Sequence, residues 1–271
     1  MARKDIKEIT DKLEQGVKEV FESDRYKEYL TVMGRFTNYS FNNIMLILMQ
    51  KPEATLVAGY KAWQNKFKRQ VRKGEKGITI LAPCPHKKEV EDEDGTVKVV
   101  SWTSFRAVKV FDIAQTDGED LPTAPCEKLT ASVNDYDKLM TKLAQVSPVE
   151  IRFEDISGSA NGYFHNADDK YIAVQQGMSE AQTIKTAVHE IAHSLLHDND
   201  NGEEKDADRL TREVQAESVA YTVCNALGLD TSDYSFGYVA GWSGGKDMKE
   251  LTASMEVIRK TAAGIIDALA D

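Results

Sequence analysis

The sequence predicts an α+β fold in two domains, residues 1–118 and 131–271, joined by a linker over residues 119–130. The first observation behind this prediction is the distribution of charge. Residues 1–111 carry 21 Lys and Arg against 15 Asp and Glu, whereas residues 112–271 carry 13 against 29. Such an asymmetry between the halves of a chain indicates domains with different partners. The second observation is local composition, because the predicted linker lies in a run rich in Asp, Gly and Pro.

The overall composition is typical of a water-soluble globular protein. Of the 271 residues, 41% are hydrophobic and 29% are charged, and the strongest apolar run, residues 44–49, is far too short to cross a bilayer. The N-terminal segment lacks the apolar core of a secretory signal. The three cysteines, Cys84, Cys126 and Cys224, are odd in number and far apart. We therefore expect no disulfide framework and a cytoplasmic location.

Periodicity in the N-terminal half predicts two helices followed by antiparallel strands. Apolar residues recur at helical spacing in the first two segments, and the second of these ends at a Lys-Pro break. A turn rich in Asp and Glu then joins segments of strand-like composition. The predicted elements are helices over residues 3–30 and 40–50, strands over residues 78–83, 97–101 and 105–111, and a turn near residues 91–96.

A basic stretch follows the second predicted helix, and aromatic residues are interleaved with its lysines and arginines. This combination is typical of a groove for single-stranded nucleic acid, because cations bind phosphates while aromatic rings stack on bases. The alternative is a solvated basic hairpin whose aromatic rings lie in the core. The candidate contacts are Tyr39, Trp63, Lys66, Arg69, Arg72, Lys73 and Lys76.

Several segments in this half resemble the N-terminal domain of ArdC-type antirestriction proteins, a family found on conjugative plasmids and integrative elements. The similar segments are residues 38–43, 50–52, 59–63, 71–77 and 110–116. The resemblance covers roughly residues 5–118 and implies a domain that binds single-stranded DNA. It adds Asn42 to the candidate contacts and supports Tyr39, Trp63, Arg72, Lys73 and Lys76. For Tyr39 and Trp63, packing in the core and stacking on a base both remain open.

In the C-terminal half, the motif His189-Glu190-x-x-His193 predicts a zinc site. Ser179 and Gln182 form a capping-box pattern that starts a helix over residues 180–197, with the motif in its middle. On a helix the two histidines leave the same face one turn apart, so both can bind one Zn²⁺. Glu190 then lies close enough to act as general base on a metal-bound water. The motif is therefore typical of a zinc hydrolase.

The next predicted helix, residues 206–227, carries Glu213 and Glu217 one turn apart. Thermolysin-like zincins have a similar arrangement, and the resemblance implies that Glu213 is the third metal ligand. It also implies that Glu217 holds the other ring nitrogen of His189. This chain has Glu where the zincin pattern has Asp, so the exchange of the two roles stays open. His197 continues the spacing of the histidines but is expected to serve as a helix-end or packing residue.

Residues 216–221 and 230–235 resemble the C-terminal domain of ArdC-like proteins, which is akin to ImmA/IrrE-type metallopeptidases. The resemblance implies a zincin-like metallopeptidase domain with a small mixed sheet. In zincins, an edge strand just before the active-site helix pairs with an extended peptide. Residues 170–175 have the composition of a strand at this place in the sequence.

Three functions are compatible with these features. The first is a protein that binds single-stranded DNA and carries an active Zn²⁺ peptidase domain, serving antirestriction during transfer of a mobile genetic element. The second is a DNA-binding protector whose zinc site does not cleave protein. The third is a regulatory protease that cleaves a repressor, as ImmA/IrrE-like relatives do. In each case the expected partner is single-stranded DNA, with an unidentified protein substrate in the first and third, and no membrane.

Overall fold

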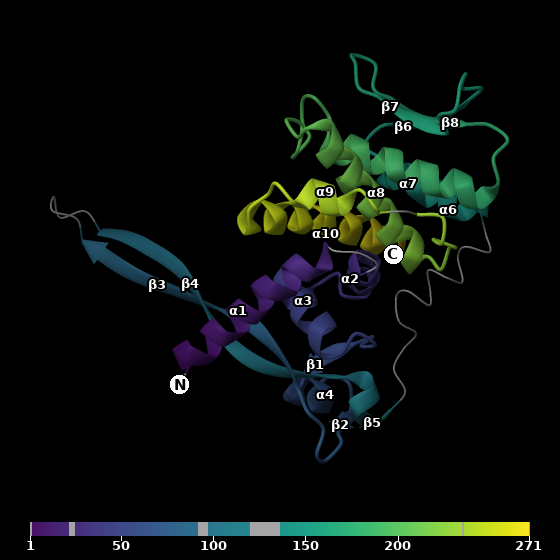
Figure 1. The fold of residues 1–271 in the computed structure, drawn as a ribbon. Coiled ribbons are helices and arrows are strands. Elements are labelled where there is room, and N and C mark those ends of the chain that lie inside the picture. The colour runs from purple at the N-terminus through teal and green to yellow at the C-terminus, as the bar shows by residue number, and fades with distance from the viewer. Residues whose placement is uncertain (1, 22–24, 92–96, 120–135, 235, 271) are drawn as a thin grey trace. The chain divides into compact units, whose positions relative to one another are not determined.

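The computed structural model describes residues 2–21, 25–91, 97–119, 136–234 and 236–270 (Figure 1). Contacts divide the chain into an N-terminal unit, Met1–Val17 with Met45–Glu119, and a C-terminal unit, Lys18–Ile44 with Asp120–Asp271. The division differs from the predicted boundary, because residues 18–44 group with the C-terminal unit. The predicted linker lies, apart from Glu119, outside the described residues.

The N-terminal unit contains a three-stranded antiparallel sheet in the order β1-β4-β3 and a two-stranded sheet of β2 and β5. Its helices include part of α1 and part of α3. The elements are α1 (Ala2–Val20), α3 (Phe41–Gln50), β1 (Val57–Gly59), α4 (Tyr60–Asn65), β2 (Arg69–Val71), β3 (Ile78–Glu91), β4 (Val97–Asp112), η1 (Ile113–Gln115) and β5 (Thr116–Gly118).

β3 and β4 form one long two-stranded ribbon, visible in Figure 1. Their pairing runs without a break from Ile78 opposite Val110 to Glu91 opposite Val97. The sequence predicted shorter strands with a gap after residue 101, because the outer half of β4 is exposed on both faces and lacks a core-facing apolar alternation. The predicted turn near residues 91–96 lies, apart from Glu91, outside the described residues.

The inner end of this ribbon belongs to the core of the N-terminal unit. Ile78, Ile80 and Val110 are buried there. Trp63 on α4 is also buried, and its indole N–H donates a hydrogen bond to the backbone oxygen of Phe111 at 2.8 Å. These contacts fix α4 against the end of β4.

The C-terminal unit packs helices against a mixed three-stranded sheet in the order β6-β8-β7. β6 and β8 are parallel, whereas β7 is antiparallel to β8. A small mixed sheet was predicted for this domain. The elements are α2 (Arg25–Arg35), α6 (Tyr136–Val146), β6 (Glu150–Glu154), β7 (Gly162–His165), β8 (Tyr171–Gln175), α7 (Glu180–Leu196), α8 (Arg209–Ala226), α9 (Val239–Ser243) and α10 (Met248–Ala270).

The single helix predicted over residues 3–30 is wrong in extent, because α1 ends at Val20 and α2 begins at Arg25. α2 packs on α8, where the hydroxyl groups of Tyr26 and Ser218 lie 2.8 Å apart. Gly34 lets the two helices approach closely, since a Cβ at this position would lie 3.3 Å from the Thr222 side chain. This packing explains why α2 groups with the C-terminal unit.

In the described part of the chain, no helix combines the length and the apolar character that a membrane span requires.

Candidate metal centre and nucleic-acid interface

The helix that carries the histidine motif begins as the sequence predicted. The Ser179 side chain accepts a hydrogen bond from the backbone N–H of Gln182 at 3.3 Å and caps α7. The reciprocal half of the capping box is not formed, because the Gln182 side chain donates to the Thr186 hydroxyl instead, at 3.4 Å. The apolar stripe of α7 is buried, so the opposite face presents His189 and His193 together.

Three potential ligand atoms converge at this face of α7. The Nε2 atoms of His189 and His193 lie 3.1 Å apart. The Glu213 Oε2 atom, from α8, lies 3.8 Å from the first and 3.9 Å from the second. Ligand atoms about 2.1 Å from a tetrahedral zinc ion are about 3.4 Å from one another. The three residues therefore fit one divalent metal ion.

Glu217 occupies a different position from Glu213. Its Oε2 atom lies 3.3 Å from His189 Nδ1, on the side of the ring that faces away from the convergence point. This geometry favours Glu213 as the ligand and Glu217 as the group that orients His189. Burial lowers the pKa of His189, but the hydrogen bond with Glu217 and the nearby carboxylates outweigh burial, and the net pKa is raised.

His197 orients the second histidine of the motif. His193 Nδ1 lies 2.9 Å from His197 Nδ1, and His197 Nε2 lies 2.9 Å from Gln215 Oε1. The Gln215 amide nitrogen donates to Ser254 at 3.1 Å and to the Glu204 carboxylate at 3.4 Å.

These hydrogen-bond partners determine which ring nitrogens of His197 and His193 carry a proton. A carboxylate only accepts hydrogen bonds, so the Gln215 amide nitrogen faces Glu204 and its oxygen faces His197. His197 Nε2 must therefore donate, which leaves His197 Nδ1 as an acceptor for the N–H of His193. The Nε2 lone pair of His193 then faces the candidate metal site. His197 was predicted to be a helix-end or packing residue, and it is indeed the buried C-cap of α7; its contact with His193 adds a positioning role.

Glu190 is buried beside these ligands. Burial raises its pKa to about 7, and the negative charge of Glu213 also raises it. His189 and a hydrogen bond from the backbone amide of Phe164 lower the pKa, but by less. Phe164 belongs to β7, so this strand lies against the carboxylate. Gly162 in the same strand makes the close approach possible, because a Cβ there would lie 3.3 Å from the Glu190 side chain.

Two pockets meet at Gly162, His189 and Glu190. The first, of about 270 Å³, is also lined by Lys185 and Tyr234. The second, of about 710 Å³, is also lined by Tyr163, Phe164, His193, Arg209 and Arg212. A groove therefore passes on both sides of the candidate metal site. No motif in the sequence pointed to Lys185, Arg209 or Arg212 as lining residues.

The strand next to this groove is not the one expected from the sequence. β8, which covers the predicted strand 170–175, is the central strand of the sheet and is paired on both sides. β7 and β6 are the edge strands of this sheet, and β7 lines both pockets through Gly162. The order of strands in a sheet depends on tertiary pairing, which the local pattern does not encode.

The candidate DNA contacts divide into several groups. The prediction that Trp63 contacts DNA is wrong, because its ring is fully buried and its N–H donates a hydrogen bond within the core. Tyr39 and Asn42 belong to the C-terminal unit, whereas the other candidates belong to the N-terminal unit. The Tyr39 ring packs edge-on against Phe36, and burial raises its pKa.

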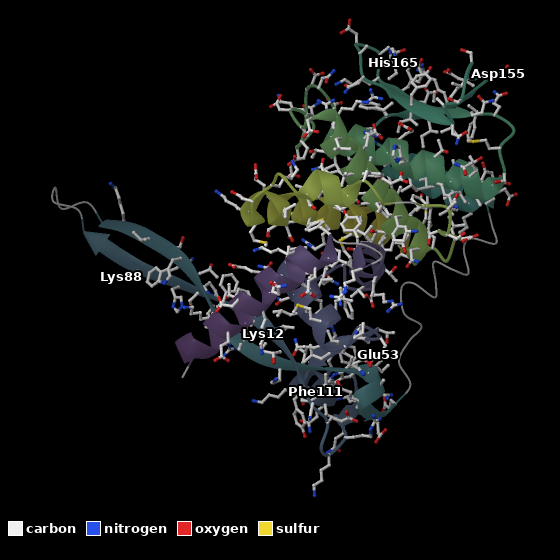
Figure 2. The ribbon with its side chains drawn as sticks, in the orientation of Figure 1. Lys12, Glu53, Lys88, Phe111, Asp155 and His165 are labelled. Atoms are coloured by element: carbon white, nitrogen blue, oxygen red, sulfur yellow. The ribbon has the colours of Figure 1, made fainter. Side chains whose placement is uncertain are left out.

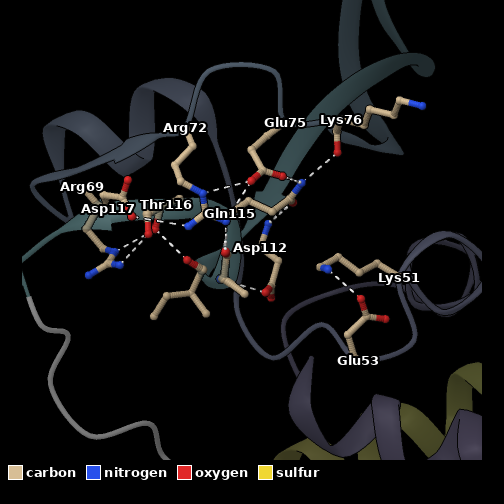
Figure 3. Close-up of polar contacts among 12 residues, drawn as sticks. Lys51, Glu53, Arg69, Arg72, Glu75, Lys76, Asp112, Gln115, Thr116 and Asp117 are labelled. Carbon is tan, nitrogen blue, oxygen red and sulfur yellow. Dashed lines mark hydrogen bonds and ion pairs between the residues drawn. The ribbon is translucent and has the colours of Figure 1, made fainter.

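Two of the candidate arginines hold the N-terminal unit together (Figure 3). Arg69 donates to the hydroxyl of Thr116 at 2.8 Å and to its backbone oxygen at 2.9 Å. Arg72 pairs with Glu75 at 2.8 Å and with Asp117 at 3.4 Å. These guanidinium groups are therefore engaged within the fold. Lys66, Lys73 and Lys76 are exposed.

Family models match both parts of the chain. The model of the N-terminal domain of anti-restriction factor ArdC matches residues 2–111. The model of the IrrE N-terminal-like domain matches residues 144–233, which include the histidine motif and both candidate glutamates. The chain is also 28% identical to an uncharacterised protein of Bacillus anthracis, over 98% of this chain and 51% of that protein. It thus spans about half the length of this curated relative.

The fold is similar to crystal structures of the antirestriction protein ArdC from plasmid R388. The metal-free structure is 24% identical, with a TM-score of 0.55, over 86% of this chain and 85% of that one. The Mn(II)-bound structure is 21% identical, with the same TM-score of 0.55, over 96% of this chain and 97% of that one. The chain therefore resembles ArdC-like antirestriction proteins in its fold and in the order of its matched domains, with an ArdC-type N-terminal domain followed by an IrrE-type domain.

Proposed function

We propose that this protein binds single-stranded DNA through its N-terminal unit and hydrolyses peptide bonds at a zinc centre in its C-terminal unit. Its biological role would be to protect incoming DNA from restriction during transfer of a mobile element, within the cytoplasm. The observation that carries the enzymatic part is the convergence of His189, His193 and Glu213 beside Glu190. The match of residues 2–111 to the N-terminal domain of anti-restriction factor ArdC supports the antirestriction role.

The donor set favours zinc. Two neutral imidazoles and one carboxylate are a known set for catalytic zinc, and they leave a coordination position open. A zinc ion held there would supply a Lewis acid and lower the pKa of a water molecule toward neutrality. The Mn(II)-bound structure of R388 ArdC supports a divalent metal in this fold.

The remaining residues of the site have roles that follow from their positions. Glu190, with a pKa raised to about 7 by burial, is suited to accept a proton from an attacking water and return it to the leaving amine. Among the described strands β7 pairs only with β8, so its other edge is suited to pair with an extended peptide that lies in the groove.

Exposed cations of the N-terminal unit support the DNA-binding part of the proposal. Lys66, Lys73 and Lys76 retain the role assigned to them from the sequence. Lys76 also lines a pocket of about 610 Å³ together with Lys51, Lys109 and Glu53, and Glu53 pairs with Lys51 at 2.7 Å. The exposed lysines Lys66, Lys73 and Lys76 are suited to bind the phosphates of a DNA strand.

A comparison of the wild type with Glu190→Gln tests the peptidase. Both proteins would be incubated with lysate of a host cell, and new protein N-termini would be identified by mass spectrometry. We expect cleavage by the wild type alone and equal zinc content in both proteins. A mutant without zinc would contradict the assigned roles. A wild type that holds zinc but cleaves no protein favours the DNA-binding protector, and cleavage confined to a repressor favours the regulatory protease.

Fluorescence anisotropy with a labelled 30-residue oligo(dT), at several salt concentrations, tests DNA binding. We expect the affinity to fall steeply with salt, because lysine–phosphate contacts release counterions. An affinity that does not change with salt would contradict the proposed lysine contacts.

A further inference from the structure

We infer that the outer half of the β3–β4 ribbon is a stacking platform for single-stranded DNA, formed by Trp102 and His86 with basic residues around them. The inference rests on the proposed DNA-binding function and assigns it a surface that the sequence analysis did not single out. Lys88 marks this part of the ribbon in Figure 2, and Phe111 marks the opposite end of β4.

The strand register defines the face that forms the platform. Residues directly opposite one another in an antiparallel pair share a face, and successive residues alternate between faces. His86 lies opposite Trp102, Lys88 opposite Val100 and Ala82 opposite Arg106. We call the face that carries them the basic face.

The outer half of the basic face carries cations but no carboxylate among its described residues. The residues there include the two rings of His86 and Trp102 and the cations Lys88, Lys98 and Arg106. A chain with a net charge of −10 would repel a polyanion in most places. The cations of this face are therefore suited to bind phosphate, whereas Glu89 and Glu91 occupy register positions of the opposite face.

The two rings on this face form a prearranged stack. The rings of His86 and Trp102 lie 5.3 Å apart between centroids and are inclined by only 16°. His86 Nε2 is hydrogen-bonded to the Ser104 hydroxyl at 2.7 Å, which holds its ring in place. The Trp102 side chain nevertheless remains 49% exposed. A base can therefore add to rings that are already ordered, which reduces the entropic cost of binding.

The opposite face of the same ribbon provides a matched control. Phe105 lies on that face opposite Pro83 and is 52% exposed, so it resembles Trp102 in exposure and in its place on the strand. In the described part of the chain, neither face of the outer ribbon is covered by a third strand. Truncation of either ring should therefore leave the fold intact, which thermal unfolding would verify.

The experiment uses the full chain, oligo(dT) of 30 residues and the variants Trp102→Ala and Phe105→Ala. We expect Trp102→Ala to weaken DNA binding by about tenfold or more and Phe105→Ala to leave it within about twofold. Lys88→Gln should reduce the slope of log affinity against log salt by about 0.7 for each phosphate that the variant no longer binds.

Tryptophan fluorescence supplies a second measurement. The chain has three tryptophans, and Trp63 and Trp242 are 0% and 4% exposed, so only Trp102 can stack on an added base. Oligo(dT) should therefore quench the emission of the wild type and of Phe105→Ala. The same titration should leave the emission of Trp102→Ala nearly unchanged.

The possible results separate the platform from the general function. If the wild type does not bind oligo(dT), both proposals fail. If it binds but Trp102→Ala and Phe105→Ala behave alike, the platform is wrong and DNA binding stands. If Trp102→Ala changes the molecular mass measured by sedimentation but leaves DNA affinity unchanged, the basic face is instead a contact between two copies of this chain. A Trp102 effect seen only with duplex DNA would also overturn the platform.

Discussion

The two candidate ligand histidines differ in what holds their second ring nitrogen. The Nδ1 atom of His189 faces the Glu217 carboxylate, whereas that of His193 faces the neutral ring of His197. A carboxylate partner increases the basicity of a ligand histidine, and a neutral partner mainly fixes its orientation. The two groups therefore make distinct contributions to metal binding, and each contribution can be measured at the scale of single residues.

The roles of the two glutamates are tested by Glu213→Gln and Glu217→Gln. We expect Glu217→Gln to weaken zinc binding by roughly 10- to 100-fold, as removal of an orienting group does. Glu213→Gln should weaken it further, because it removes a direct charged ligand. Competition with a chromophoric chelator would give both affinities. A larger effect of Glu217→Gln would exchange the two roles.

The role of His197 is tested by His197→Ala, with His197→Asn as the conservative variant. We expect His197→Ala to weaken zinc binding by roughly tenfold or more, because it removes the acceptor that fixes the tautomer of His193. The side-chain oxygen of Asn can accept the same proton, so His197→Asn should recover part of the affinity.

A matched control is His165→Ala, since His165 stacks on Tyr171 and lines neither pocket. Nitrogen chemical shifts in the NMR spectrum of the metal-free protein report the tautomer of His193. Equal tautomer populations in the wild type and His197→Ala would contradict the positioning role.

The sequence predicted the positions of some residues better than others. The spacing of His189 and His193 on a helix determines their geometry, so local information was sufficient for them. Trp63 was selected because lysines surround it in the sequence, yet its ring lies in the core. Trp102 was overlooked, although it is the exposed tryptophan of the described chain. Whether an aromatic ring is buried depends on tertiary packing, which a single sequence does not specify.

At the scale of secondary-structure elements, the position of β7 beside α7 determines how Glu190 is held. A Cβ on Gly162 would lie 2.6 Å from the Thr186 side chain and 2.8 Å from the Ala173 backbone oxygen. Because the second contact is with backbone, the strand itself has to move if this position carries a side chain.

We therefore expect Gly162→Ala to lower the free energy of unfolding by about 1–3 kcal/mol. It should also reduce hydrolysis while zinc stays bound, since the amide of Phe164 would shift from Glu190 and the ligands would not. Urea unfolding and zinc analysis measure the two effects. The control is Gly264→Ala in α10, where no atom would lie within 4 Å of the new Cβ. This change should be neutral or stabilising by up to about 1 kcal/mol.

A second element-level contact joins α10 to the start of α3. Glu256 accepts a hydrogen bond from the backbone N–H of Phe41 at 3.0 Å and pairs with Arg259 at 2.7 Å. Burial raises the pKa of Glu256, but Arg259 and the Phe41 amide outweigh burial, and the net pKa is lowered. The stabilisation is therefore fully present above the ordinary pKa of a glutamate, about 4.3, and disappears as the pH falls through the lower folded value.

Glu256→Gln should accordingly lower the free energy of unfolding by about 1 kcal/mol at pH 7. The difference from the wild type should shrink as the pH falls below about 4, because the wild-type carboxyl group is then protonated too. Urea unfolding at both pH values measures the effect. A difference that stays constant with pH would show that the charge of Glu256 does not stabilise the contact.

The elements themselves were predicted to different degrees. The helices predicted over residues 40–50 and 180–197 agree with α3 and α7 to within about one residue, because a proline break and a serine cap mark their ends. The segment 3–30 has one continuous apolar periodicity but forms two helices. Periodicity identifies the apolar face of a helix, and it does not reveal that α2 packs on α8.

At the scale of the whole molecule, the two proposed activities are assigned to different units. The candidate ligands lie on α7 and α8 of the C-terminal unit, whereas Lys66, Lys73 and the platform residue Trp102 lie in the N-terminal unit. The charge asymmetry of the sequence predicts domains with different partners, in line with this proposal. It did not predict that residues 18–44 would group with the C-terminal unit, because charge is a property of the surface and the grouping is a property of the core.

Removal of the metal should therefore affect one activity and spare the other. We expect a chelator such as 1,10-phenanthroline to abolish protein cleavage and to lower the melting temperature, because a ligand that binds the folded state alone stabilises it. The affinity for oligo(dT) should stay within about twofold, since none of the proposed DNA contacts in the N-terminal unit belongs to the ligand set. Fluorescence anisotropy with and without the chelator measures the affinity for oligo(dT), and the same measurement on Glu213→Gln repeats the test without a chelator. A decrease in DNA affinity of tenfold or more in both experiments would mean that the metal centre supports the DNA-binding surface.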